Sequence, residues 1–153
     1  MTPAGTRQPD VEIEIPPRPE YVGVVRHLMG AVARLGQHSP EFVENAKLAG
    51  SEACANAVML TGRAGAHERI EVGAMLDEDR LEIVVTDRGE SVRAPQDLAS
   101  GPTDTPVTGF ESGLSVPLLE GLVDGLTIED RDDGGNVVRM TLMREFEGED
   151  EAE

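Results

Sequence analysis

The chain contains few aromatic residues and almost no cysteine. Among its 153 residues there is no tryptophan, one tyrosine and three phenylalanines, so the interior must be built from aliphatic side chains. The single cysteine, Cys54, cannot form an internal disulfide, which fits a reducing cytoplasm. The three histidines are scattered and form no metal-ligand pattern with it. A metal held by protein ligands alone is therefore not expected.

Basic residues and long apolar runs are also scarce. Thirteen Lys and Arg stand against thirty Asp and Glu, which gives a formal net charge of −17. Such a field repels nucleic acid and suits a basic protein partner, although solubility alone also accounts for the sign. No apolar run approaches the roughly 20 residues of a membrane span, and the N-terminus lacks a signal-peptide pattern. We expect a cytoplasmic globular protein with one domain and no membrane contact.

The polar ends of the chain differ from its patterned middle. Residues 1–10 are predicted to be a flexible leader, and residues 144–153 ("REFEGEDEAE") an acidic disordered tail. One folded domain is expected between them, over residues 11–143. Within it, residues 88–112 lack periodicity and are rich in Gly, Pro, Ser and Thr. A loop of this length inside a compact domain is often a functional lid.

Helical and alternating patterns predict the elements of this domain. Three helices are expected, at residues 19–35, 40–60 and 114–123. Alternation predicts five strands, at residues 11–15, 69–76, 81–87, 126–130 and 136–143. The turn "DDGG" joins the last two. This order predicts a two-layer α/β (α+β) sandwich, with three helices on one face of a mixed, mostly antiparallel sheet.

The first predicted helix has two contrasting faces. An apolar stripe extends from Val22 to Leu35 along one side. The opposite face carries Arg26, His27 and Arg34. In an acidic chain this face is a candidate protein contact, although a solvated helix surface gives the same pattern.

The stretch "KLAGSEACANAVML", residues 47–60, carries two polar side chains on one face of an Ala-rich helix. Glu52 and Asn56 are four residues apart, and Asn45 lies on the same face. Such a pair can serve a polyphosphate site, with the amide oxygen binding Mg²⁺ and the carboxylate accepting a proton. The spacing fits a solvated stripe equally, so this alternative stays open.

Two further segments have the same ambiguity. In "TDRGES", after a strand, Asp87 can accept a hydrogen bond from the amino group of adenine, and Gly89 lets a flat ring approach the backbone. "GFESGLSVPLLEGL" places Gly113, Leu114 and Ser115 at a helix start, where free backbone N–H groups can bind phosphate. Each pattern is also common in ordinary turns and capped helices.

Taken in order, these motifs resemble the GHKL (Bergerat) ATP-binding fold, and in particular the RsbW-type anti-sigma factor serine kinases of bacteria. "PRPEYVGVVRHLMGAVARLG" is similar to the first helix of that family, and "KLAGSEACANAV" to its N box. "EDRLEIVVTDRGES" is similar to its G1 segment, and "SGLSVPLLEGLVDGLTI" to its G2 segment. The resemblance extends from Val11 to Met143.

The resemblance implies a role for each matching residue. Glu52 would be the general base that activates a serine hydroxyl, and Asn56 would bind the Mg²⁺ that bridges the phosphates. Asp87 and Gly89 would contact the adenine of ATP or ADP. Thr141, on the last strand, would lie near the same ring.

The G2 segment departs from the family pattern. Where the family has Gly-Leu-Gly-Leu, this chain has Gly113-Leu114-Ser115-Val116, followed by Pro117. Ser115 adds a side chain where the backbone would approach phosphate. It can donate a hydrogen bond there, or it can obstruct the site.

The resemblance implies an anti-sigma factor that sequesters a stress-type sigma factor. It would phosphorylate a serine of a STAS-domain anti-anti-sigma protein, using ATP and Mg²⁺, and it would form a homodimer. The alternative is a non-catalytic sigma-binding module with a degenerate nucleotide site. The catalytic domain of a two-component histidine kinase is disfavoured, because no helical segment with an acceptor histidine precedes the domain.

Overall fold

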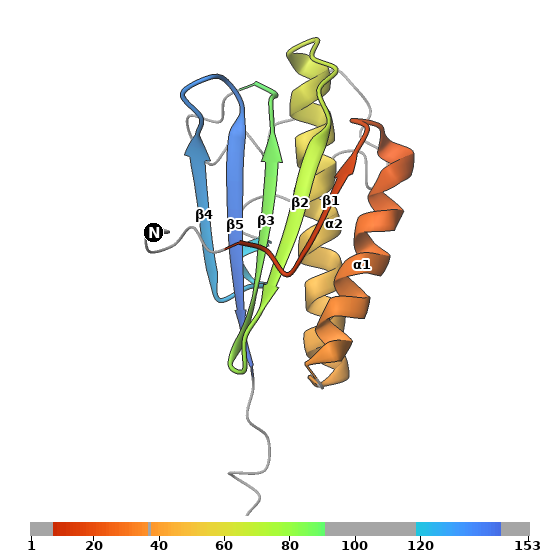
Figure 1. Cartoon of the computed structure of the whole chain (residues 1–153), viewed down its shortest axis with the longest axis vertical. Coiled ribbons are helices and arrows are strands. Elements are labelled where there is room, and N and C mark those ends of the chain that lie inside the picture. Colours follow the sequence, from red (N-terminus) through yellow and green to blue (C-terminus); the bar gives the residue numbers. More distant parts are fainter. Residues whose placement is uncertain (1–7, 37, 91–118, 145–153) are drawn as a thin grey trace, which may run out of the picture.

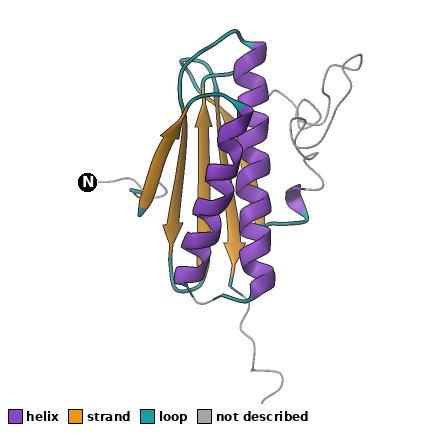
Figure 2. Ribbon diagram, turned by 90° about the vertical axis from the view of Figure 1, so that its right-hand side faces the viewer, coloured by secondary structure: helices purple, strands orange, loops and turns teal. Residues whose placement is uncertain are grey.

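The computed structural model describes residues 8–36, 38–90 and 119–144. These residues form two layers, with long helices covering one face of a five-stranded sheet (Figures 1 and 2). None of the described helices is long and apolar enough to cross a membrane.

The helical layer contains α1 (Val22–Leu35), which follows the short 3-10 helix η1 (Pro19–Tyr21), and α2 (Pro40–Arg63). The backbone N–H of Phe42 donates a hydrogen bond to Ser39 Oγ over 3.1 Å, so Ser39 caps α2, and a proline occupies the first turn. The first two helices are therefore confirmed.

Five strands form the sheet: β1 (Val11–Ile15), β2 (Ile70–Leu76), β3 (Arg80–Asp87), β4 (Gly125–Asp130) and β5 (Asn136–Met143). Their order across the sheet is β1-β2-β3-β5-β4. Every pairing among these described strands is antiparallel. The two-layer sandwich is confirmed, without a parallel pair in this part of the chain.

The glycine turn predicted between the last two strands joins β4 to β5. Gly134 and Gly135 have φ angles of 99° and 104°, in the left-handed region that favours glycine. A Cβ atom on Gly135 would also lie 2.7 Å from the Cα atom of Arg88. The turn can therefore sit against the end of β3 only because this residue has no side chain.

The third helix, predicted at residues 114–123, lies mostly outside the described residues. Leu119 and Glu120 are helical, but the chain turns at the next two residues. There the N–H of Leu122 donates to the carbonyl oxygen of Leu119 over 2.9 Å. The predicted end of this helix at Val123 is therefore wrong, because a tight turn replaces its last residues.

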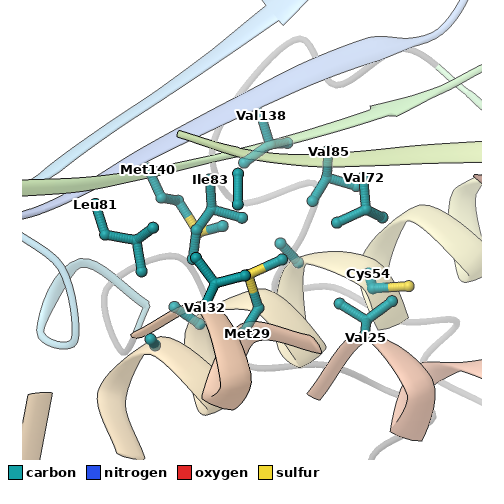
Figure 3. Close-up of a cluster of buried hydrophobic side chains, with 14 of the residues drawn as sticks. Val25, Met29, Val32, Cys54, Val72, Leu81, Ile83, Val85, Val138 and Met140 are labelled. Atoms are coloured by element: carbon teal, nitrogen blue, oxygen red, sulfur yellow. The ribbon is translucent and has the colours of Figure 1, made fainter. Parts of the chain in front are cut away.

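The core lies between the sheet and the helices and is aliphatic, as the composition predicts (Figure 3). A Cβ atom on Gly50 of α2 would lie 2.5 Å from Cγ of Met29, so this glycine lets α1 and α2 come close together. Cys54 is buried in the same cluster, and burial raises the pKa of its thiol to about 12. The apolar stripe of α1 stops short of its predicted end, because Leu35 is 72% exposed.

Candidate nucleotide-binding site

The middle of α2 is buried on all sides. Every residue from Ala49 to Ala57 is buried, and within this range Glu52 is only 8% exposed and Asn56 only 3%. Asn45, two turns earlier on the helix, is half-buried. The alternative of a solvated stripe is therefore wrong for Glu52 and Asn56, which lie inside the protein.

Asn56 has an unusual environment for a buried amide. Neither its Nδ2 nor its Oδ1 atom has a hydrogen-bond partner within the described part of the chain. A buried polar group without a partner costs about 1–3 kcal/mol. Native structures rarely retain such a group without a reason, and a bound polar ligand is one.

A second buried polar group lies where β3 ends and β5 begins. The carboxylate of Asp87 is 1% exposed, and the register pairs this residue with Asn136, which is fully buried. Asp87 Oδ1 accepts hydrogen bonds from the backbone N–H of Gly89 over 2.7 Å and from Asn136 Nδ2 over 3.1 Å. Oδ2 has no partner among the described residues. One carboxylate oxygen is thus held by the protein, while the other remains an acceptor.

Opposing influences act on the proton of Asp87. Burial is the largest, and it raises the pKa of the carboxyl group above its usual value. Hydrogen bonds from Gly89 and Asn136, together with the charge of Arg131, act in the opposite direction. The N–H donors therefore favour the ionised form, which can accept a hydrogen bond but cannot donate one.

Gly89 lies so close to the backbone of α2 that a side chain would not fit there. A Cβ atom there would lie 2.5 Å from the backbone nitrogen of Thr61 and 2.7 Å from the carbonyl oxygen of Leu60. The next residue, Glu90, donates its N–H to the same Leu60 oxygen over 3.0 Å. The missing side chain thus allows contact with the helix. Its predicted contact with adenine stays a prediction.

Asn136 is a site residue that the sequence reading missed. Its Nδ2 atom donates to the carbonyl oxygen of Glu90 over 2.9 Å as well as to Asp87. One amide therefore joins the start of β5 to the last residue of β3 and to Glu90 in the segment that follows it. The signal was its place directly after the two turn glycines, but only the strand register shows that Asp87 lies opposite.

The placement of Thr141 corrects a prediction. Side chains alternate along β5, so Val138, Met140 and Leu142 point into the core with Asn136. Thr141 points to the other face of the sheet and pairs with Glu82, five residues along β5 from Asn136. The structure does not bring Thr141 to Asp87, because a side chain at an odd-numbered position of this strand faces away from the helices.

The phosphate-binding part of the predicted site lies outside the described residues. This applies to Gly113, Leu114 and Ser115, and to residues 91–112 of the predicted lid, which begins at Arg88. The acidic tail, apart from Arg144, also lies outside them. The predictions for these segments stay predictions.

The possible metal ligands among the described residues fit Mg²⁺ bound together with a nucleotide better than a metal held by protein side chains alone. The described residues contain no group of three or more His, Cys, Asp or Glu side chains that could hold a metal. Asn56 Oδ1 is a hard oxygen ligand of the kind Mg²⁺ accepts alongside phosphate and water oxygens. The buried, unpartnered amide is therefore compatible with a metal that arrives with its phosphates.

Comparisons with known proteins identify the family. The histidine kinase-like ATPase domain matches residues 15–142. The serine-protein kinase RsbW of Bacillus subtilis is 33% identical over 135 residues, and that of Bacillus pumilus is 36% identical over 137. Each alignment covers 86% of this chain and 83% of the relative. The solved histidine kinase domain of the E. coli osmosensor EnvZ aligns over 94% of both chains at 16% identity, with a TM-score of 0.45. The chain belongs to the histidine kinase-like ATPase domain family and, within it, to the RsbW-type serine-protein kinases.

Proposed function

We propose that the chain is an ATP-dependent protein serine kinase that also acts as a cytoplasmic anti-sigma factor. Its protein substrate would be a STAS-domain anti-anti-sigma protein, and its regulatory target a stress-type sigma factor. Membership of the RsbW-type family supports the kinase part of this proposal.

The observation that carries the proposal is a pair of buried polar groups, on α2 and at the end of β3, that have no partner among the described residues. Asn56 offers an amide, and Asp87 offers Oδ2. Together they correspond to the two ends of a nucleotide, because hard oxygen ligands suit a metal–phosphate group and a carboxylate oxygen suits the amino group of a base. A ligand that satisfies both groups removes the cost of burying them.

Glu52 lies one helical turn from Asn56 on the same face of α2. In the proposed reaction, its carboxylate accepts the proton of the substrate serine hydroxyl. The serine oxygen then forms a bond to the γ-phosphorus of ATP, and the bond between that phosphorus and the bridging oxygen breaks to release ADP. Bound Mg²⁺ would neutralise charge on the phosphates, and Asn56 is the described residue suited to hold it.

The charge of α1 supports a protein partner. This helix carries Arg26, His27 and Arg34 but no acidic residue, in a chain with a net charge of −17. Leu35 at its end is exposed. We assign this surface to a partner with an acidic face, and the sigma factor and the STAS-domain protein are the two candidates.

The sheet face opposite the helices supports a homodimer. Arg139 on this face makes no ion pair with any described residue, while Glu82 and Glu129 lie on the neighbouring strands. Opposite charges on one surface are self-complementary under two-fold symmetry. Sedimentation equilibrium at low and high salt tests this assembly, and a monomer at low salt would contradict it.

The kinase is tested by separating binding from phosphate transfer. Glu52→Gln keeps the size of the side chain but removes the base, so transfer to a STAS-domain protein should fall by about 100-fold or more. Titration calorimetry should show unchanged affinity for ADP. Asn56→Ala should instead weaken binding of ATP with Mg²⁺.

The wild-type results separate the proposal from its alternative. Mg²⁺-dependent ATP binding and transfer that is lost in Glu52→Gln would support the kinase. Binding of a sigma factor without detectable ATP binding would contradict it and favour the non-catalytic module.

A further inference from the structure

Asn136 is fully buried, although its side chain is an amide. Its Nδ2 atom donates one hydrogen bond to Asp87 Oδ1 over 3.1 Å and another to the carbonyl oxygen of Glu90 over 2.9 Å. Its backbone N–H also stabilises the Asp87 carboxylate. Both protons of one amide group are therefore used to fix the surroundings of a single acid.

We propose that Asn136 is a positioning residue that keeps Asp87 ionised and directs its Oδ2 atom toward the base, so that the site accepts a 6-amino purine and rejects a 6-oxo purine. This inference rests on the proposed nucleotide site. It adds a residue that decides which base the site takes.

The geometry separates the two oxygens of Asp87. Oδ1 is occupied by Gly89 and Asn136, and within the described chain Oδ2 is not. An ionised Oδ2 can only accept a hydrogen bond, so it matches an exocyclic amino group. A 6-oxo purine presents a carbonyl oxygen at that position, and two acceptors repel each other.

Protonation would reverse this preference. A neutral Asp87 carries an O–H that can donate to a 6-oxo group, and burial favours that neutral form. The donors from Asn136 oppose it. Removing the side-chain donor by substitution should therefore weaken discrimination as well as affinity.

The other charged groups around Asp87 are mostly paired. Arg88 forms an ion pair with Asp133 over 2.7 Å, and Arg131 lies 3.6 Å from the same aspartate. On α2, Arg63 lies 3.8 Å from Glu90, and the charged side chain in the buried stretch from Ala49 to Ala57 is Glu52. Arg131 favours ionised Asp87 through its charge alone. Asn136 is therefore the side chain that both favours the ionised form of Asp87 and sets the direction of its Oδ2 atom.

The test is calorimetric titration with ADP and with IDP, in which the amino group is replaced by a carbonyl. Asn136→Ala should lower the ratio of ADP to IDP affinity by about tenfold or more, because the side-chain hydrogen bond to the charged Asp87 is lost. Thr141→Ala is the matched control, since it lies on the same strand but on the opposite face of the sheet. It should leave the ratio unchanged.

The pH profile distinguishes positioning from a merely structural role. In Asn136→Ala, Asp87 becomes easier to protonate, so ADP affinity relative to wild type should fall as the pH becomes mildly acidic. Asn136→Asp should show the opposite slope. Its carboxyl group, when protonated at mildly acidic pH, can donate to Asp87 in place of the amide, whereas two ionised carboxylates repel at higher pH. The β-phosphate of ADP titrates in all variants, so the readout is the ratio to wild type.

The outcomes separate the two levels of the proposal. If wild type binds neither nucleotide, the proposed function fails. If wild type prefers ADP but both variants keep its selectivity and its pH profile, only the role of Asn136 is overturned. Should Asn136→Ala fail to fold, Asn136→Asp preserves the shape of the side chain, and its reversed slope still decides the question.

Discussion

The two ends of α2 both bury polar atoms without partners, yet they differ in what surrounds those atoms. At the start of the helix, neither ring nitrogen of His38 has a hydrogen-bond partner among the described residues, and the ring stacks on Phe42 with centroids 3.8 Å apart. In the second half, Asn56 is equally unpartnered, and the G1 segment with Asp87 packs against the end of the helix. At the His38 end the unpartnered ring packs on an aromatic neighbour, whereas at the other end the proposed nucleotide would satisfy both Asn56 and Asp87 Oδ2.

The largest expected effect on stability comes from a change in the packing of Gly89 against the C-terminal end of α2. Gly89→Ala places a Cβ atom 2.5 Å from the backbone nitrogen of Thr61, and backbone cannot move aside cheaply. We expect a loss of about 1–3 kcal/mol in the free energy of unfolding, as for other overpacked positions. Urea denaturation measures it.

Gly62→Ala is the matched control for that measurement. It lies in the same helix, one residue beyond Thr61, and its Cβ atom would meet nothing within 4 Å. A helical glycine replaced by alanine should gain about 0.5–1 kcal/mol. Equal effects of the two substitutions would show that α2 and the G1 segment are not packed as described.

The next effect in size comes from Asn56→Leu, which should raise the stability of the protein but remove its nucleotide binding. Asn56→Leu replaces an unpartnered amide with an apolar side chain of similar size, so the nucleotide-free protein should become more stable by about 1–2 kcal/mol. The same change should abolish binding of ATP with Mg²⁺. Thermal unfolding with and without nucleotide measures both, and a destabilised variant would mean that the amide has a structural partner.

The smallest effect concerns the other end of α2. Burial, with a smaller contribution from the charge of Arg144, lowers the pKa of His38. The unfolded chain therefore binds more protons than the folded one just below the usual histidine pKa of about 6.5. Stability should fall as the pH drops through this value and level off below the folded pKa.

His38→Leu should remove that part of the pH dependence. His67→Leu, at an exposed histidine in the loop between α2 and β2, is the control and should not remove it. An unchanged slope in His38→Leu would place the titration elsewhere. None of these changes at His38 should alter nucleotide binding, which keeps the two ends of the helix distinct.

Local pattern was enough to predict most of the fold. Helix caps and strand alternation placed α1, α2 and the β2–β3 hairpin, since each depends on residues close in sequence. The sequence places Leu35 in the buried stripe of α1, but periodicity does not show where a helix extends beyond the elements that cover it. The end of the third helix was missed because a tight turn at Leu122 overrides helical pattern.

The site was only partly predictable for the same reason. The sequence identifies Glu52, Asn56 and Asp87 as candidates because each lies in a recognisable local motif, and the structure shows that all three are buried. Asn136 and Thr141 could be told apart only by strand parity and register, and these depend on pairing between β3 and β5. The packing of Gly89 against Leu60 could not be predicted either, because it joins segments that are far apart in the chain.

The pairing of β3 with β5 has a consequence for how the chain can vary in length. Asp87 and Asn136 are 49 positions apart in sequence, and their contact closes a loop that contains residues 91–118. The entropy of closing such a loop grows only with the logarithm of its length, so doubling it costs only about 0.6 kcal/mol. The bonds that hold Glu90 to Leu60 and Asn136 fix where this loop begins. We therefore expect the folded domain to tolerate changes in chain length beyond Glu90, while the contacts between the end of β3 and the start of β5 stay the same.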